Sequence, residues 1–164
     1  MEKLILPALL VGAGATAVMD LWAVARKHLL CIPLPDYGLV GRWIAHMALS
    51  GRFHHDRISA APAVRGERAI GWIAHYLTGI VFAALLIALC GIEWLRQPAI
   101  GPALLVGVAT VAAPFLLMQP GMGAGLAARR TPNPSAARVR SLVTHAIFGL
   151  GLYAGGWTAA LLVR

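Results

Sequence analysis

The chain has 164 residues, of which 59% are hydrophobic and only 12% charged, and its formal net charge is +8. Soluble domains average about 45–50% apolar and about 25% charged residues, so the composition excludes an ordinary soluble domain. It also excludes an intrinsically disordered chain, which needs low hydrophobicity and high charge. The positive charge does not indicate nucleic-acid binding, because it lies in short segments between long apolar stretches.

The first predicted membrane span runs from about Leu4 to Ala25 and is interrupted only by Asp20. A helix that crosses the hydrocarbon core of about 30 Å needs about 20 mostly apolar residues, and this stretch provides them. The first 17 residues also resemble a cleaved secretory signal. We expect a retained span instead, because the apolar stretch resumes after Asp20 and no soluble region follows.

A long connector of about residues 26–68 follows the first span. Its segment from Gly41 to Leu49 has apolar residues near helical spacing, with Arg42, Trp43 and His46 among them. This pattern predicts an amphipathic helix at the level of the lipid headgroups.

The later apolar stretches predict three further spans, of about residues 69–92, 99–119 and 142–163. They are continuous and rich in Ala, Leu and Gly, whereas the strands of a membrane barrel would alternate in polarity. Between the last two spans, Asn133 or Ser135 is placed to cap the final helix, and Pro134 suits its first turn. The predicted fold is an all-α integral membrane protein with four transmembrane helices and one interfacial helix.

The distribution of positive charge predicts how the chain lies in the membrane. Most Lys and Arg residues occur in the two long connectors and their flanks, whereas the other side carries only Lys3, Arg96 and Arg164. Cytoplasmic loops of membrane proteins are enriched in Lys and Arg. We therefore expect a bacterial inner-membrane protein with both termini in the periplasm.

The sequence contains an internal duplication. The hexapeptide PALLVG occurs at residues 7–12 and again at 102–107, opening the first and third spans. The second and fourth spans each contain one histidine, His75 and His145 respectively, with small residues four positions away on each side. The repeats predict two tandem hairpins of parallel orientation, about 4–92 and about 99–164, within a single transmembrane domain over 1–164.

Small residues at helical spacing are the usual packing surface between helices in lipid. The residues predicted to pack helices together in this way are Gly71, Gly79, Gly149, Gly151 and Gly155. Because four short spans leave little room for a central pathway, we expect a homodimer or a larger membrane complex. The glycine-rich face of the fourth span is the expected contact.

Three ionisable residues fall at similar depth in the predicted spans. Asp20, His75 and His145 lie about 8–10 Å from the basic residues that flank their helices, at about 1.5 Å per residue. Gln119 and Thr16 are expected to join them. Because ionisable groups are costly in a bilayer, such a cluster indicates a functional site by default.

The cluster is compatible with several functions. A carboxylate beside imidazoles forms a proton relay or an ion-binding site, and this favours a small permease-like protein. His75, His145 and Asp20 are also suitable ligands for a transition metal, and the two histidines for haem, which would indicate a redox protein. The third alternative is an accessory or assembly factor whose polar groups only hold helices together. No enzyme motif favours catalysis.

Several segments together resemble a bacterial inner-membrane family of unknown function. They are Met19–Trp22, Gly38–Trp43, Val64–Arg68, Ala74–Tyr76, Met118–Pro120 and Arg130–Pro134. The resemblance covers essentially the whole chain and implies a four-span protein of the cytoplasmic membrane. It implies no activity and no site residues.

Overall fold

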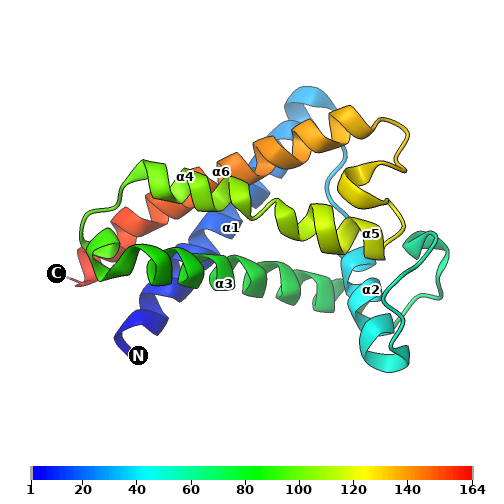
Figure 1. The fold of residues 1–164 in the computed structure, drawn as a ribbon, viewed down its shortest axis with the longest axis horizontal. Helices are drawn as coiled ribbons and strands as arrows, with labels where there is room; N and C mark the ends of the chain where they lie inside the picture. Colours follow the sequence, from blue (N-terminus) through cyan, green and yellow to red (C-terminus); the bar gives the residue numbers. More distant parts are fainter. Residues whose placement is uncertain (1, 164) are drawn as a thin grey trace. The chain divides into compact units, whose positions relative to one another are not determined.

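The computed structural model describes residues 2–163, and side chains from Leu4 to Leu161. Lys3 and Arg164, two residues of the charge argument, have side chains outside the described range. Every ordered element in that range is helical and none is a strand, which confirms the all-α prediction (Figure 1). The helices are α1 (Glu2–Leu30), α2 (Tyr37–Ser50), α3 (Glu67–Arg96), α4 (Ile100–Ala109), α5 (Gln119–Gly121) and α6 (Pro134–Val163), and the short turns between them are η1 (Ile58–Ala60), η2 (Pro114–Met118) and η3 (Leu126–Ala128).

Three helical segments of the described chain are long and apolar enough to cross a membrane. They are Leu4–Leu30, Glu67–Arg96 and Ile100–Met122, and they cover the first three predicted spans. The fourth predicted span, 142–163, lies within α6 and is not one of these three segments. The apolar helices indicate a multi-pass protein in a lipid bilayer.

The helix ends follow local sequence rules. The Asp36 side chain accepts a hydrogen bond from the Gly38 amide at 2.9 Å and caps the start of α2. Gly51, with φ of 66°, ends that helix in the left-handed conformation that glycine adopts without strain. The Asn133 side chain accepts a hydrogen bond from the Ala136 amide at 3.1 Å, and α6 starts at Pro134. The capping prediction for Asn133 is therefore confirmed.

The described chain divides into two compact units, each assembled from segments that are distant in sequence. We refer to residues 2–34, 76–110 and 142–163 as the apolar unit, and to residues 35–75 and 111–141 as the connector unit. The apolar unit contains α1, α4 and the C-terminal parts of α3 and α6. The connector unit contains α2, α5 and the starts of α3 and α6.

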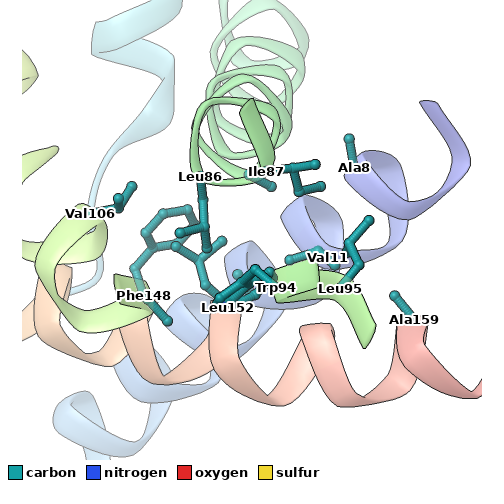
Figure 2. Packing of buried hydrophobic residues seen from close by; sticks show 13 residues of the cluster. Ala8, Val11, Leu86, Ile87, Trp94, Leu95, Val106, Phe148, Leu152 and Ala159 are labelled. Carbon is teal, nitrogen blue, oxygen red and sulfur yellow. The ribbon is translucent and has the colours of Figure 1, made fainter. Parts of the chain in front are cut away.

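The core of the apolar unit is formed by small, branched aliphatic and aromatic residues from four helices (Figure 2). The side chains of Val11, Leu86, Leu95 and Leu152 are fully buried there. Gly91, with φ of 74°, interrupts α3, and Trp94 follows within the core. The indole of Trp94 donates a hydrogen bond to the Ala99 carbonyl at 3.1 Å, which ties the end of α3 to the start of α4.

The connector unit is joined by aromatic side chains and close backbone contacts. A Cβ atom at Gly41 would overlap the Glu67 carbonyl, and one at Gly71 would overlap the Tyr37 carbonyl. These glycines therefore allow α2 and the start of α3 to pack backbone against backbone. The indole of Trp43 donates a hydrogen bond to the Phe53 carbonyl at 2.8 Å, which holds the segment after α2 against the helix.

Candidate functional site

In the apolar unit, two pairs of helices cross at glycines. A Cβ atom at Gly12 of α1 would overlap the backbone of α3 at Gly79 and Ile80. A Cβ atom at Gly107 of α4 would overlap the backbone of α6 at Gly149. Gly12 and Gly107 each end a copy of the repeated hexapeptide, so the two closest crossings fall at equivalent positions of the two repeats.

Two further glycines of α6, Gly151 and Gly155, pack against α1 of the same chain. A Cβ atom at Gly151 would lie 2.8 Å from Ala15 Cα, and one at Gly155 would lie 3.1 Å from Val11 Cα. The sequence prediction that this glycine-rich face contacts a second copy is therefore wrong, because α1 already occupies it. The face serves close packing within one chain instead.

Asp20 of α1 is hydrogen-bonded to a tyrosine of α3. The Tyr76 hydroxyl donates to Asp20 Oδ2 at 3.1 Å, and both residues are half-buried. One turn before Asp20, the buried Thr16 hydroxyl donates to the Gly12 carbonyl at 2.8 Å. Thr16 therefore lies at the α1–α3 crossing, and Asp20 lies beside it on the same helix face.

His145 of α6 is buried and paired with a threonine of α4. The Thr110 hydroxyl lies 2.9 Å from His145 Nδ1 and 2.6 Å from the Gly107 carbonyl oxygen. Because a carbonyl only accepts, the single hydroxyl proton of Thr110 points to Gly107. Thr110 then accepts from His145, which places the proton of the neutral imidazole on Nδ1. Nε2 is therefore the nitrogen that takes up a second proton.

The connector unit contains His75 and Gln119. The Tyr37 hydroxyl lies 2.9 Å from His75 Nε2, the two rings stack with centroids 4.2 Å apart, and Trp72 meets the imidazole edge-on. Gln119 is the first residue of α5, and its buried Oε1 has no hydrogen-bond partner among the described residues.

The three predicted ionisable residues thus each have a hydroxyl partner that was not predicted from the sequence: Tyr76, Thr110 and Tyr37. Asp20, Thr16 and His145 belong to the apolar unit, whereas His75 and Gln119 belong to the connector unit. The convergence of all five at one site stays a prediction. Of the three hydroxyl partners, only Tyr76 could have been suspected from the sequence, because it directly follows the predicted site residue His75.

The described residues contain no group of three His, Cys, Asp or Glu side chains that could hold a metal ion. The proposed ligand set of His75, His145 and Asp20 has no further support from the geometry and stays a prediction. Haem ligation by the two histidines likewise stays a prediction.

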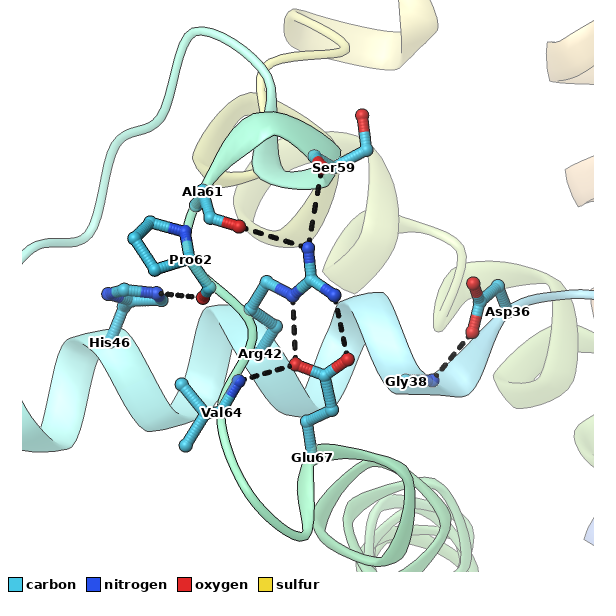
Figure 3. Close-up of polar contacts among 9 residues, drawn as sticks. All are labelled: Asp36, Gly38, Arg42, His46, Ser59, Ala61, Pro62, Val64 and Glu67. Carbon is cyan, nitrogen blue, oxygen red and sulfur yellow. Dashed lines mark hydrogen bonds and ion pairs between the residues drawn. The ribbon is translucent and has the colours of Figure 1, made fainter.

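An ion pair that was not predicted from the sequence fixes the connector unit (Figure 3). Arg42 of α2 donates from Nε and Nη2 to the two carboxylate oxygens of Glu67, at 2.8 and 2.7 Å. Arg42 Nη1 donates to the carbonyls of Ser59 and Ala61, and the Val64 amide donates to Glu67. The hydrogen bonds and charge of Glu67 raise the pKa of the Arg42 guanidinium above its ordinary value. This pair anchors the loop before α3 and is structural.

The comparisons with known proteins give one match. The model of a family described as "Protein of unknown function (DUF2938)" matches residues 9–159. No curated protein and no solved structure matches the chain.

Proposed function

The chain belongs to the DUF2938 family, and we propose that it is a small permease-like protein that binds a proton or a small cation at Asp20. In this proposal it lies in the bacterial inner membrane with four spans and with both termini in the periplasm. The fourth span is the C-terminal part of α6. The family description names no activity, so the proposal depends on the residues of this chain.

The observation that carries the proposal is the Asp20–Tyr76 hydrogen bond within two apolar helices. A carboxylate placed in an apolar span is costly, and such groups commonly belong to ion and proton pathways. A phenol donates to an ionised carboxylate and accepts from a protonated one. The pair therefore keeps its hydrogen bond whether or not Asp20 carries a proton, which is what a reversible proton site requires.

His145 supports the same proposal from the second repeat. Thr110 fixes Nδ1 as the protonated nitrogen, so proton uptake occurs at Nε2. A carboxylate in one repeat and an imidazole in the other provide two titratable groups in the apolar unit.

The test is proton uptake by proteoliposomes that contain a trapped pH indicator, under an imposed potassium-diffusion potential. The purified protein is expected to accelerate acidification over empty vesicles, and Asp20→Asn to abolish that acceleration. Tyr76→Phe is expected to reduce it. The matched control is Asp36→Asn, because Asp36 is a carboxylate outside the candidate spans and Asn caps a helix equally well. Equal flux through wild type and Asp20→Asn would contradict the proposal.

A second candidate function is a non-catalytic accessory or assembly factor. It is favoured by the finding that Asp20 and His145 each have a hydrogen-bond partner on another helix of the apolar unit. Hydrogen bonds between membrane helices contribute about 0.6 kcal/mol each to stability on average. Such bonds can therefore stabilise a helix bundle that has no transport role. In that case Asp20→Asn lowers the thermal midpoint, and neither wild type nor variant moves protons.

A further inference from the structure

The connector between α4 and α6 is strongly and uniformly basic. No Asp or Glu follows Glu93 in the sequence, whereas the connector and the first turns of α6 contain Arg129, Arg130, Arg138 and Arg140. All four side chains are exposed. Arg129, Arg130 and Arg138 take part in no ion pair within the described residues. This surface therefore has a net positive charge that its own segment does not neutralise.

A strained turn brings three of these arginines together. Gly125, with φ of 74°, lies beneath the side chains of Arg129 and Arg130, whose Cγ atoms are 2.8 and 2.9 Å from where a Cβ atom would lie. Ala127, with φ of 45°, is left-handed, which is rare for a residue other than glycine. Its carbonyl accepts a hydrogen bond from Arg138 Nε at 2.8 Å.

Such backbone strain persists only where the surroundings enforce it, and it is concentrated at functional and ligand-binding segments. Here the strained turn fixes two arginine stems over one glycine and ties a third arginine, from α6, to the same turn. Arginine presents a planar set of donors that matches a phosphate group with paired hydrogen bonds. Exposed Leu126 and Val139 belong to the same segment, with 49% and 59% of their surface accessible.

We propose that Arg129, Arg130 and Arg138 bind the phosphate of an anionic phospholipid, while Leu126 and Val139 contact its acyl chains. The site rests on the proposed placement of α6 as a span, because that places the turn at the cytoplasmic headgroups. The exposed apolar residues favour a lipid over a free phosphate, which has no apolar part. Anionic lipids of the cytoplasmic leaflet attract basic segments next to a membrane helix.

The test is a titration of delipidated protein in detergent with phosphatidylglycerol, followed by native mass spectrometry. Wild type is expected to bind phosphatidylglycerol in preference to phosphatidylcholine, and R129Q/R130Q to bind it about tenfold more weakly, since charge-assisted hydrogen bonds are lost. The matched control is R52Q/R57Q, which removes two exposed charges from another loop of the connector unit. It is expected to stay within about twofold of wild type, because scattered surface charges contribute little.

Two competition measurements distinguish a lipid phosphate from a soluble phosphate as the ligand. Inorganic phosphate and glycerol phosphate are expected not to displace the bound lipid, and displacement by either at equal concentration would replace the lipid site with a soluble-anion site. An equal loss of binding in R52Q/R57Q and R129Q/R130Q would overturn the proposal, since only net charge would then matter. The single variants R129Q and R130Q repeat the test if the double variant does not fold. Proton flux is not measured, so failure here is distinct from failure of the proposed function.

Discussion

The two units of this chain are both helical but are held together in different ways. In the apolar unit the helices cross at Gly12 and Gly107, where backbones touch directly, around a core of fully buried aliphatic side chains. In the connector unit, α2 and the start of α3 also touch backbone to backbone, at Gly41 and Gly71, but polar bonds are added. Arg42 and Trp43 donate to backbone carbonyls of neighbouring loops, and Arg42 also pairs with Glu67.

The proposed placement in a bilayer accounts for the close packing of the apolar unit. Lipid tails are as apolar as leucine, so burial of apolar surface contributes little to association between membrane helices, and close packing of small residues takes its place. In the connector unit, several polar bonds meet at Arg42 and Glu67 and together hold the loop before α3. The comparison therefore predicts that close backbone contact at glycines limits stability in the apolar unit, and that shared polar bonds contribute in addition in the connector unit.

The largest expected effect is that of Gly107→Ala. The new methyl group would overlap the backbone of α6 at Gly149, so the crossing has to open. We expect a loss of about 2–3 kcal/mol in the free energy of unfolding, measured by denaturation in detergent. Gly101→Ala on the same helix is the control, because no atom lies within 4 Å of the place that its new methyl group would occupy, and stability should not fall. Equal destabilisation by both would remove backbone clearance as the explanation.

A smaller effect is expected from Arg42→Met, which keeps an unbranched side-chain stem but removes the guanidinium. It removes both guanidinium donors from the Glu67 carboxylate, which keeps only the Val64 amide, and it removes the donor to the Ala61 carbonyl. The loop before α3 therefore loosens. We expect a lower thermal midpoint and faster proteolysis between residues 51 and 66. Arg96→Met is the control, since the Arg96–Glu93 pair is highly exposed and such pairs contribute little. A midpoint equal to that of wild type would show that the pair does not stabilise this unit.

The smallest expected effect is that of Thr110→Val, which tests a single polar bond in the apolar unit. The change preserves shape but removes the acceptor for His145 Nδ1. We expect a loss of about 1 kcal/mol in the free energy of unfolding. Thr158→Val, at an exposed threonine of α6, is expected to have no measurable effect. A cost above that of Gly107→Ala would reverse the ranking of close packing over polar bonds.

Much of the fold could be predicted from local sequence. Apolar run length predicted three segments that the structure shows as candidate spans, and the Asn133–Pro134 pair predicted the start of α6. These features depend on neighbouring residues, so one sequence suffices. The non-helical Gly91 inside α3 was not predicted, because a glycine in an apolar helix usually continues it.

The polar partners were harder to predict because they come from distant segments. Helical spacing places Gly12, Thr16 and Asp20 on one face, but it does not say which residue of another helix meets that face. Tyr76 is 56 residues from Asp20, and Glu67 is 25 residues from Arg42. Helix spacing within one segment carries no information about such pairings.

The contact between α1 and α6 constrains how the protein is made. Val11 and Ala15 of α1 pack on Gly155 and Gly151 of α6, which follow them in the chain by 144 and 136 residues. Until α6 has been synthesised, this side of the first helix lacks its protein partner and must be covered by lipid or by an insertion factor. The apolar unit is therefore completed only after α6 is available, and a chain that stops before residue 149 cannot complete it.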